Sequence, residues 1–149
     1  MIIVITRVDK ADCTIDNKIY SSINKGLLLL VGIQQDDTDI VIEKLAKKIA
    51  SLRIFADDNN KTNLSILDTK GSILSISQFT LAANCKKGNR PSFTNAKEPN
   101  EASRLYDKFN NELRCYNINV ESGIFGANMK ISSINDGPFT IVLDSKEIL

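Results

Sequence analysis

The chain has 149 residues, a length typical of one domain, and a chain of this size buries roughly 70% of its unfolded surface. Hydrophobic residues make up 42% and charged residues 25%, which excludes a collagen-like or low-complexity protein and argues against general disorder. Lys and Arg total 19 and Asp and Glu total 18, so the net charge of +1 indicates neither nucleic acid nor membrane, and any electrostatic footprint must be local.

Histidine is absent, which excludes Ser-His-Asp and Cys-His catalysis as well as histidine-ligated zinc. The three cysteines, Cys13, Cys85 and Cys115, are far apart and odd in number, so they indicate reduced thiols in a reducing compartment rather than a disulfide framework. The acidic pairs at 36–37 and 57–58 have no further ligand at metal-binding spacing. We therefore expect neither a metal nor another cofactor.

No segment has the pattern of a secretory signal or a membrane span. Charged residues follow the apolar stretch at 1–5 at once, so no signal core forms. The longest apolar run, Leu27 to Val31, is far below the roughly 20 residues that a membrane helix needs. These features predict a cytoplasmic protein without a membrane partner.

Three strands are predicted at the start of the chain. Residues 2–5 are apolar and β-branched, and residues 15–23 alternate weakly around polar positions, as in a half-exposed strand. Residues 26–33 form a short apolar block flanked by glycines, and its length favours a buried strand over a helix.

An amphipathic helix is predicted next. Asp36, Asp37 and Thr38 are candidate N-terminal caps. Apolar residues then recur at helical spacing, at Ile42, Leu45, Ile49 and Leu52. The polar run at 57–61 predicts a turn.

The second half of the chain predicts a strand at 72–81, a polar irregular stretch at 83–98, and a second helix. Pro99 suits the first position of that helix. Its apolar stripe consists of Ala102, Leu105, Phe109, Leu113 and Tyr116.

Two final strands, at 129–134 and 139–143, are predicted on either side of a turn at 135–138. Strands therefore outnumber helices, and strands separate the two helices in the sequence. This order indicates an α/β protein with helices packed on a mixed sheet.

A polar cluster, Ser77-Gln78-Phe79-Thr80, ends the strand predicted at 72–81. Strand ends are common positions for sites, because backbone N–H groups become free there. The hydroxyls of Ser77 and Thr80 are possible nucleophiles, but each needs a base and the chain has no histidine. The alternative is an ordinary strand end whose hydroxyls bond locally.

The stretch from Thr69 to Lys97 contains no acidic residue and five basic ones: Lys70, Lys86, Lys87, Arg90 and Lys97. Local positive charge after the polar strand end suits phosphates, as in proteins that bind nucleic acids. A solvated basic loop without a ligand is the alternative.

The segment Asn135-Asp136-Gly137-Pro138 also has two interpretations. Gly-Pro between strands is usually a turn. If the Gly137–Pro138 bond were cis, it would be an uncommon conformer that fixes carbonyl positions for a geometric purpose.

Two segments together resemble the signature motifs of the D-aminoacyl-tRNA deacylase family, namely Ser77-Gln78-Phe79-Thr80-Leu81 and Asn135-Asp136-Gly137-Pro138-Phe139-Thr140. Both motifs at this separation are highly specific, whereas either alone is weak. The resemblance runs almost from end to end, with further matches at Arg7-Val8, the strand ending at Gly32, Arg53-Ile54-Phe55, residues 61–65, Arg90-Pro91-Ser92-Phe93, and Phe125, Ala127, Asn128 and Met129.

The resemblance implies a mixed α/β fold in a homodimer, with β-sheets in a barrel-like core and two main helices packed on it. It implies an enzyme that hydrolyses the ester between a D-amino acid and the terminal ribose of tRNA. The active site is then expected at the dimer interface. The Ser77 to Thr80 strand of one subunit would face the Gly137–Pro138 motif of the other, and that peptide bond would be cis.

The same resemblance implies residue roles. Gly137 and Pro138 would present carbonyls that exclude an L side chain, and Arg7 would help to hold them. The segment Ser77-Gln78-Phe79-Thr80 would form the catalytic part of the site. Phe79 and Thr80 would line the substrate pocket, which would also involve Asn135, Met129 and Ala102. Of the basic residues, we expect Lys86, Lys87 and Arg90 to bind the tRNA, and we expect no DNA partner.

The implied chemistry does not require histidine, because an aminoacyl ester is already activated and needs mainly positioning and charge stabilisation. Backbone N–H groups near Phe79 and Thr80 could bind the oxyanion, while the neighbouring ribose 2′-hydroxyl orients water. The alternative mechanism makes Thr80 a nucleophile. Glycyl-tRNA should also be a substrate, because glycine has no side chain to clash. Two rival functions remain, a non-catalytic RNA-binding protein and a module that removes mischarged L-amino acids.

Overall fold

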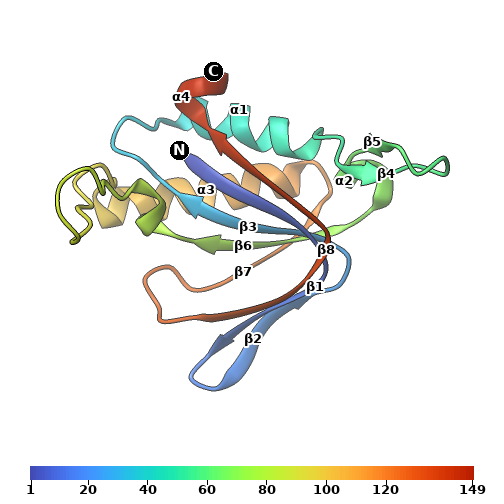
Figure 1. Cartoon of the computed structure of the whole chain (residues 1–149), viewed down its shortest axis with the longest axis horizontal. Helices are drawn as coiled ribbons and strands as arrows, with labels where there is room; N and C mark the ends of the chain where they lie inside the picture. The colour runs from blue at the N-terminus through green and yellow to red at the C-terminus, as the bar shows by residue number, and fades with distance from the viewer.

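The computed structural model describes residues 1–149, and its centre is one mixed six-stranded sheet (Figure 1). The strand order is β2-β1-β3-β6-β7, with β8 paired to the remaining side of β1. Pairing is parallel between β3 and β6 and between β6 and β7, and antiparallel elsewhere. The strands are β1 (Ile2–Ile15), β2 (Lys18–Ile23), β3 (Gly26–Gly32), β6 (Ser72–Ser77), β7 (Asn119–Ser122) and β8 (Lys130–Asp144).

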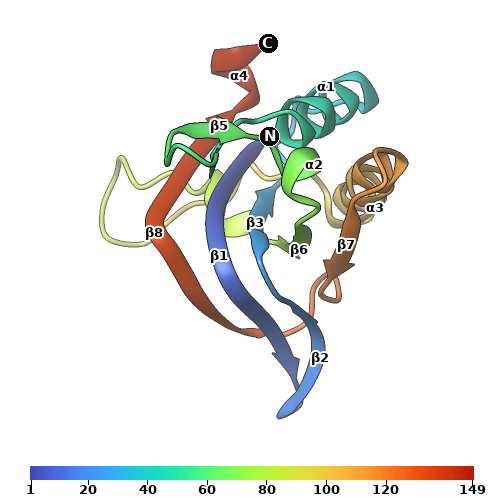
Figure 2. The ribbon, with the colours of Figure 1, turned by 90° about the vertical axis from the view of Figure 1, so that its right-hand side faces the viewer.

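Helices α1 (Asp39–Ala50) and α3 (Pro99–Cys115) pack on one face of the strongly curved sheet (Figure 2). The main core lies between them and the sheet, and α3 buries Leu105, Tyr106 and Phe109 there. Smaller elements complete the fold: β4 (Phe55–Ala56), β5 (Thr62–Leu64), α2 (Ile66–Thr69), the 3₁₀ helix η1 (Phe79–Ala82) and α4 (Ser145–Ile148). The result is an α/β fold with a nearly closed, barrel-like sheet, as expected.

Both long helices and the apolar strand between glycines were predicted correctly, and Pro99 occupies the start of α3. The prediction of caps for α1 was wrong in part. Thr38 is the N-cap but makes no side-chain hydrogen bond. Asp37 is buried and instead accepts hydrogen bonds from the amino group of Met1 and the backbone N–H of Gln34.

The strand predicted at 72–81 ends earlier, at Ser77, and the chain then turns into η1. At the start of the chain, β1 continues to Ile15 and β2 begins only at Lys18. Asp16 and Asn17, with φ of 49° and 62°, form the left-handed turn between them. Asparagine and aspartate tolerate this conformation better than other residues.

The turn predicted at 135–138 is also wrong, because these residues lie within the single long strand β8. On β1, Thr6 pairs with Thr140 and Val8 pairs with Asn135, so residues 136–139 bulge opposite Arg7. The bulge absorbs the extra residues and pairing resumes on both sides of it. The Gly137–Pro138 peptide bond within the bulge is cis.

Candidate active site

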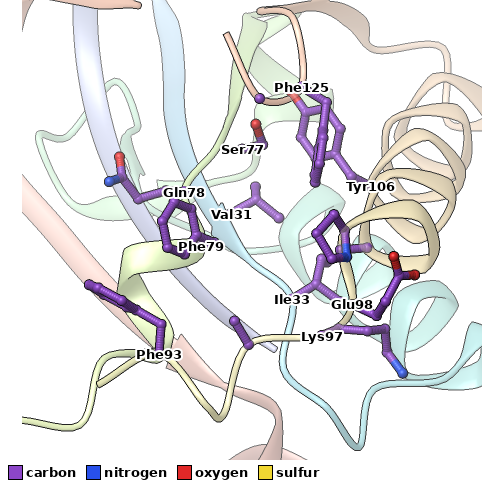
Figure 3. A pocket seen from close by; sticks show the side chains of 14 residues that line it. Val31, Ile33, Ser77, Gln78, Phe79, Phe93, Lys97, Glu98, Tyr106 and Phe125 are labelled. Carbon is purple, nitrogen blue, oxygen red and sulfur yellow. The ribbon is translucent and has the colours of Figure 1, made fainter. Parts of the chain in front are cut away.

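The end of β6 lies between two cavities of about 460 Å³ and about 270 Å³, and Figure 3 shows the larger of them. Ala102 and Tyr106 of α3 line the larger cavity, and Met129 lines the smaller. Five residues line both cavities: Ser77, Gln78, Phe79, Phe125 and Gly126. The structure therefore brings together much of the predicted Ser77 to Thr80 segment with Ala102 on one side and Met129 on the other.

The backbone leaves donors free at this strand end. The N–H of Gln78 donates to the Val31 carbonyl at 2.7 Å, which is the last bond to β3, and the N–H of Leu81 donates to the Gln78 carbonyl at 3.2 Å. The N–H groups of Phe79 and Thr80 stand between these bonds at the start of η1, where amides have no acceptor inside the helix. They are available to a ligand.

The side chains of this segment offer no general base. Thr80 is exposed, and its hydroxyl accepts a hydrogen bond from the Gln78 amide. Phe79 is 57% exposed, and its ring makes an edge contact with Phe93 at a centroid distance of 5.1 Å. An exposed aromatic pair thus stands beside the free amides, as a surface on which an apolar or planar group can pack.

The second motif lies elsewhere in the chain. Gly137 and Pro138 are exposed and line neither cavity. Two strands, β1 and β3, separate their strand from β6. Arg7, opposite the bulge, pairs with Leu27 on β3, and Leu27 pairs with Ile73 on β6. The bulge is therefore level with the start of β6, whereas Ser77 lies at the end of that strand. Within one chain, the two motifs are therefore apart.

Arg7 makes two contacts with the bulge and is itself anchored to Ile54. Its Nη1 donates to the Ile54 carbonyl at 2.7 Å, and its Nε lies 2.9 Å from Oδ2 of Asp136 in an ion pair that lacks the direction of a hydrogen bond. The guanidinium carbon also lies 4.9 Å from the centre of the Phe139 ring. The side chain of the exposed Asn135, by contrast, bonds only Ser133, whose hydroxyl donates to its Oδ1 at 2.8 Å.

The expected tRNA-binding residues, Lys86, Lys87 and Arg90, are exposed on a loop outside both cavities. Two backbone hydrogen bonds between Asn84 and Ser92, of 2.7 and 3.0 Å, close this loop. Phe93, which contacts Phe79, follows directly after it. The basic residues thus stand on a tied loop beside the strand end.

Tyr106 was not predicted to belong to the site, yet it lines the larger cavity. A residue on the buried side of a helix can pack in the core and also line a cavity, and only the tertiary structure shows that it does so. No group of three or more cysteine or acidic side chains converges to form a metal site. None of the helices combines the length and apolar character needed to cross a bilayer.

Comparison with known proteins identifies the family. The family model described as D-Tyr-tRNA(Tyr) deacylase matches residues 4–144. Proteins named D-aminoacyl-tRNA deacylase from Lactobacillus gasseri and Lactobacillus acidophilus are 55% and 56% identical to the chain, over 97% of it and 99% of each relative.

Two solved structures share the fold. The c-Myc DNA Unwinding Element Binding Protein has a TM-score of 0.91 and 36% identity, over 97% of this chain and 98% of that one. A probable eukaryotic D-amino acid tRNA deacylase has a TM-score of 0.85 at 18% identity, over 95% and 97% of the two chains. By sequence and by fold, the chain belongs to the family of D-aminoacyl-tRNA deacylases, which are ester hydrolases.

Proposed function

We propose that the chain hydrolyses the ester of D-aminoacyl-tRNA in sites shared between two copies of itself. In each site, the Ser77 to Thr80 segment of one copy faces the Gly137–Pro138 motif of the other. The observation that carries this proposal is the separation of the two motifs within one chain, where neither cavity includes Gly137 or Pro138. Two signature motifs act on one substrate only if a second copy brings them together.

The surface around the second motif supports a second copy as its occupant. β8 pairs only with β1, which leaves one edge of a 15-residue strand free. Long free edges invite pairing with another chain. On this strand Ile134 and Val142 are 60% and 63% exposed. An exposed apolar edge that carries the motif is suited to a twofold contact between copies.

The cavities suit the end of an aminoacylated tRNA. Aromatic rings of Phe79 and Phe125 line the larger cavity, and such rings stack on nucleobases. With the terminal base there, the ester would lie at the strand end. The free N–H groups of Phe79 and Thr80 can then stabilise the oxyanion that forms when water attacks the ester carbonyl.

Water attack needs an orienting group, and the site contains no evident base. The ribose 2′-hydroxyl next to the ester is the nearest candidate, which makes the RNA part of the catalyst. Handedness is then decided sterically. The backbone around Gly137 and Pro138, held by Arg7, forms a wall that an L side chain would strike. A clash against such a wall can exceed the roughly 1–3 kcal/mol that one apolar contact discriminates.

The direct test compares hydrolysis of D-alanyl-, L-alanyl- and glycyl-tRNA by the purified protein. We expect fast hydrolysis of the D form, measurable hydrolysis of the glycyl form, and almost none of the L form. Equal rates for the two alanyl forms would contradict the proposal. Faster L hydrolysis would instead indicate an editing module, and tRNA binding without any hydrolysis would indicate a non-catalytic RNA-binding protein.

Thr80→Ala should retain substantial activity. The hydroxyl of Thr80 has no base beside it, and the backbone N–H that we assign to the oxyanion survives the change. We expect kcat for D-alanyl-tRNA to fall by less than about tenfold, which corresponds to about 1.4 kcal/mol. Single-turnover kinetics would measure this step. Complete loss of hydrolysis with intact tRNA binding would favour Thr80 as a nucleophile.

Replacing Lys86, Lys87 and Arg90 together by alanine should weaken tRNA binding and reduce its salt dependence. Each lost phosphate contact lowers the slope of log K against log salt by about 0.7–0.9. Titrations of tRNA at several salt concentrations measure this slope. Lys44, Lys47 and Lys48 on α1, replaced in the same way, serve as a control of equal charge. An unchanged slope in the loop variant would refute its role.

A further inference from the structure

Tyr106 stands where the two walls of the proposed site meet. One wall is the end of β6, and the other is the segment 123–129, which follows β7 and contributes Phe125 and Gly126 to both cavities. This segment lies outside the helices and strands, so its position depends on individual contacts rather than on a ladder of backbone bonds. Two of these contacts converge on Tyr106.

The first contact is made through the carbonyl of Ser75. That carbonyl accepts a hydrogen bond from the hydroxyl of Tyr106 at 2.7 Å and another from the N–H of Gly123 at 3.2 Å. Ser75 is fully buried and lies two residues before Ser77 on β6. One carbonyl thus joins the helix α3, the strand β6 and the first residue of the 123–129 segment.

The second contact is made by the ring. Its centroid lies 6.1 Å from that of Phe125, with the two planes tilted by 48° (Figure 3). Tyr106 is only 2% exposed, so neither contact has water as a competitor. Burial also raises the pKa of its phenol, which keeps the hydroxyl a donor throughout the neutral range.

We infer that Tyr106 is a positioning residue, whose hydroxyl and ring fix the distance between the end of β6 and the wall that carries Phe125. This inference rests on the proposed function of the two cavities. Tyr106 does not touch the reacting atoms. It sets how the aminoacyl end lies against the N–H groups of Phe79 and Thr80, so its loss should affect the chemical step more than binding.

Tyr106→Phe removes the hydroxyl and keeps the ring. We expect kcat for D-alanyl-tRNA to fall between about 10- and 100-fold, because a displacement on the order of 1 Å has this effect, while KM changes by less than about twofold. Tyr116→Phe makes the same chemical change at the end of α3, outside both cavities, and should leave both constants unchanged. An unchanged kcat in Tyr106→Phe, or a rise in KM alone, would overturn the inference.

A double-mutant cycle separates positioning from loss of stability. If Tyr106 acts through the 123–129 wall, its substitution and Phe125→Leu should be strongly non-additive in kcat, whereas independent effects would add. Additive effects would overturn the inference even if both variants are less stable. Ala102→Leu, which fills part of the larger cavity, tests the site itself. If this variant has normal kinetics, the proposed function of the cavity fails, whatever Tyr106→Phe shows.

Discussion

Gly32→Ala is expected to lower kcat for D-alanyl-tRNA by about 100-fold, although the residue touches no substrate. Gly32 ends β3, and a Cβ there would lie 2.8 Å from Cβ of Leu81 and 3.0 Å from the carbonyl oxygen of Gln78. Both atoms belong to the turn that carries the free amides of Phe79 and Thr80. A backbone carbonyl and a Cβ cannot move aside alone, so the whole of η1 must shift.

Single-turnover hydrolysis measures this effect, with the thermal midpoint recorded for the same sample. Gly88→Ala is the control, because a Cβ there meets no atom within 4 Å, although its φ of +66° makes the change locally costly. Because Gly88 lies on the loop that carries Lys86, Lys87 and Arg90, the comparison is made at saturating tRNA, where we expect this variant to keep the wild-type kcat. If Gly32→Ala folds and hydrolyses within about twofold of the wild-type rate, η1 does not determine catalysis.

Of the substitutions proposed for this protein, Asp37→Asn is expected to destabilise the fold most, by about 3–5 kcal/mol in the free energy of unfolding. The amino group of Met1 is fully buried and pairs with the Asp37 carboxylate, and Gln34 Oε1 accepts its hydrogen bond at 3.0 Å. Burial already lowers the pKa of this amino group. Without the Asp37 charge, the buried amino group keeps only the neutral acceptors Gln34 and Ser145, so it must either carry a charge with no counter-ion or release its proton.

For a chain of this length, that loss corresponds to a decrease of about 10 °C in Tm. The neighbouring Asp36→Asn is a matched control. The Asp36 side chain is 79% exposed and contacts only the exposed Lys146, at 3.2 Å, so its replacement should change Tm by no more than about 2 °C. Equal shifts for the two variants would show that the buried pair does not stabilise the fold.

The elements with a strong periodic pattern could be predicted from the sequence. α1 and α3 each bury one apolar stripe, and β3 is apolar on both faces because helices cover one side and a second cluster packs on the other. β7 was missed, since Asn119 to Ser122 contains one buried residue and is too short to alternate. α2 was missed as well, although Ser65 and Asp68 form a capping box.

The course of β8 could not be predicted from local composition. Asn-Asp-Gly-Pro has the composition of a turn, and turn residues normally end a strand. Here Arg7 supplies an ion pair and a cation–π contact to the opposite strand, and pairing resumes beyond the bulge. This stabilisation comes from residues far away in the chain, so local composition could not show it.

The candidate site was predictable in its first half only. Resemblance supplied Ser77 to Thr80, Ala102 and Met129, and the structure places Ser77, Gln78, Phe79, Ala102 and Met129 on the walls of two adjacent cavities, with Thr80 in the turn that follows. The contribution of Tyr106 depends on a hydrogen bond to a backbone carbonyl, which no side-chain pattern encodes. The relation of Gly137 and Pro138 to the site depends on a second copy, which remains a proposal.

The proposed sharing of each site can be measured in a mixed dimer. Arg7→Ala removes the contacts that hold the Gly137–Pro138 wall, and we expect it to admit L-alanyl-tRNA. Gly32→Ala disables the strand end but keeps the wall. The two variants, co-expressed with different tags, are purified as a heterodimer and compared with the Arg7→Ala homodimer.

In that heterodimer, the only working strand end belongs to the Arg7→Ala copy. If its wall comes from the other copy, that wall is intact, and hydrolysis of L-alanyl-tRNA should fall to the wild-type level while D-alanyl-tRNA is still hydrolysed. The heterodimer has one working strand end and the Arg7→Ala homodimer has two. If, per working strand end, both hydrolyse L-alanyl-tRNA at the same rate, the wall acts within its own chain and the proposal of shared sites is wrong.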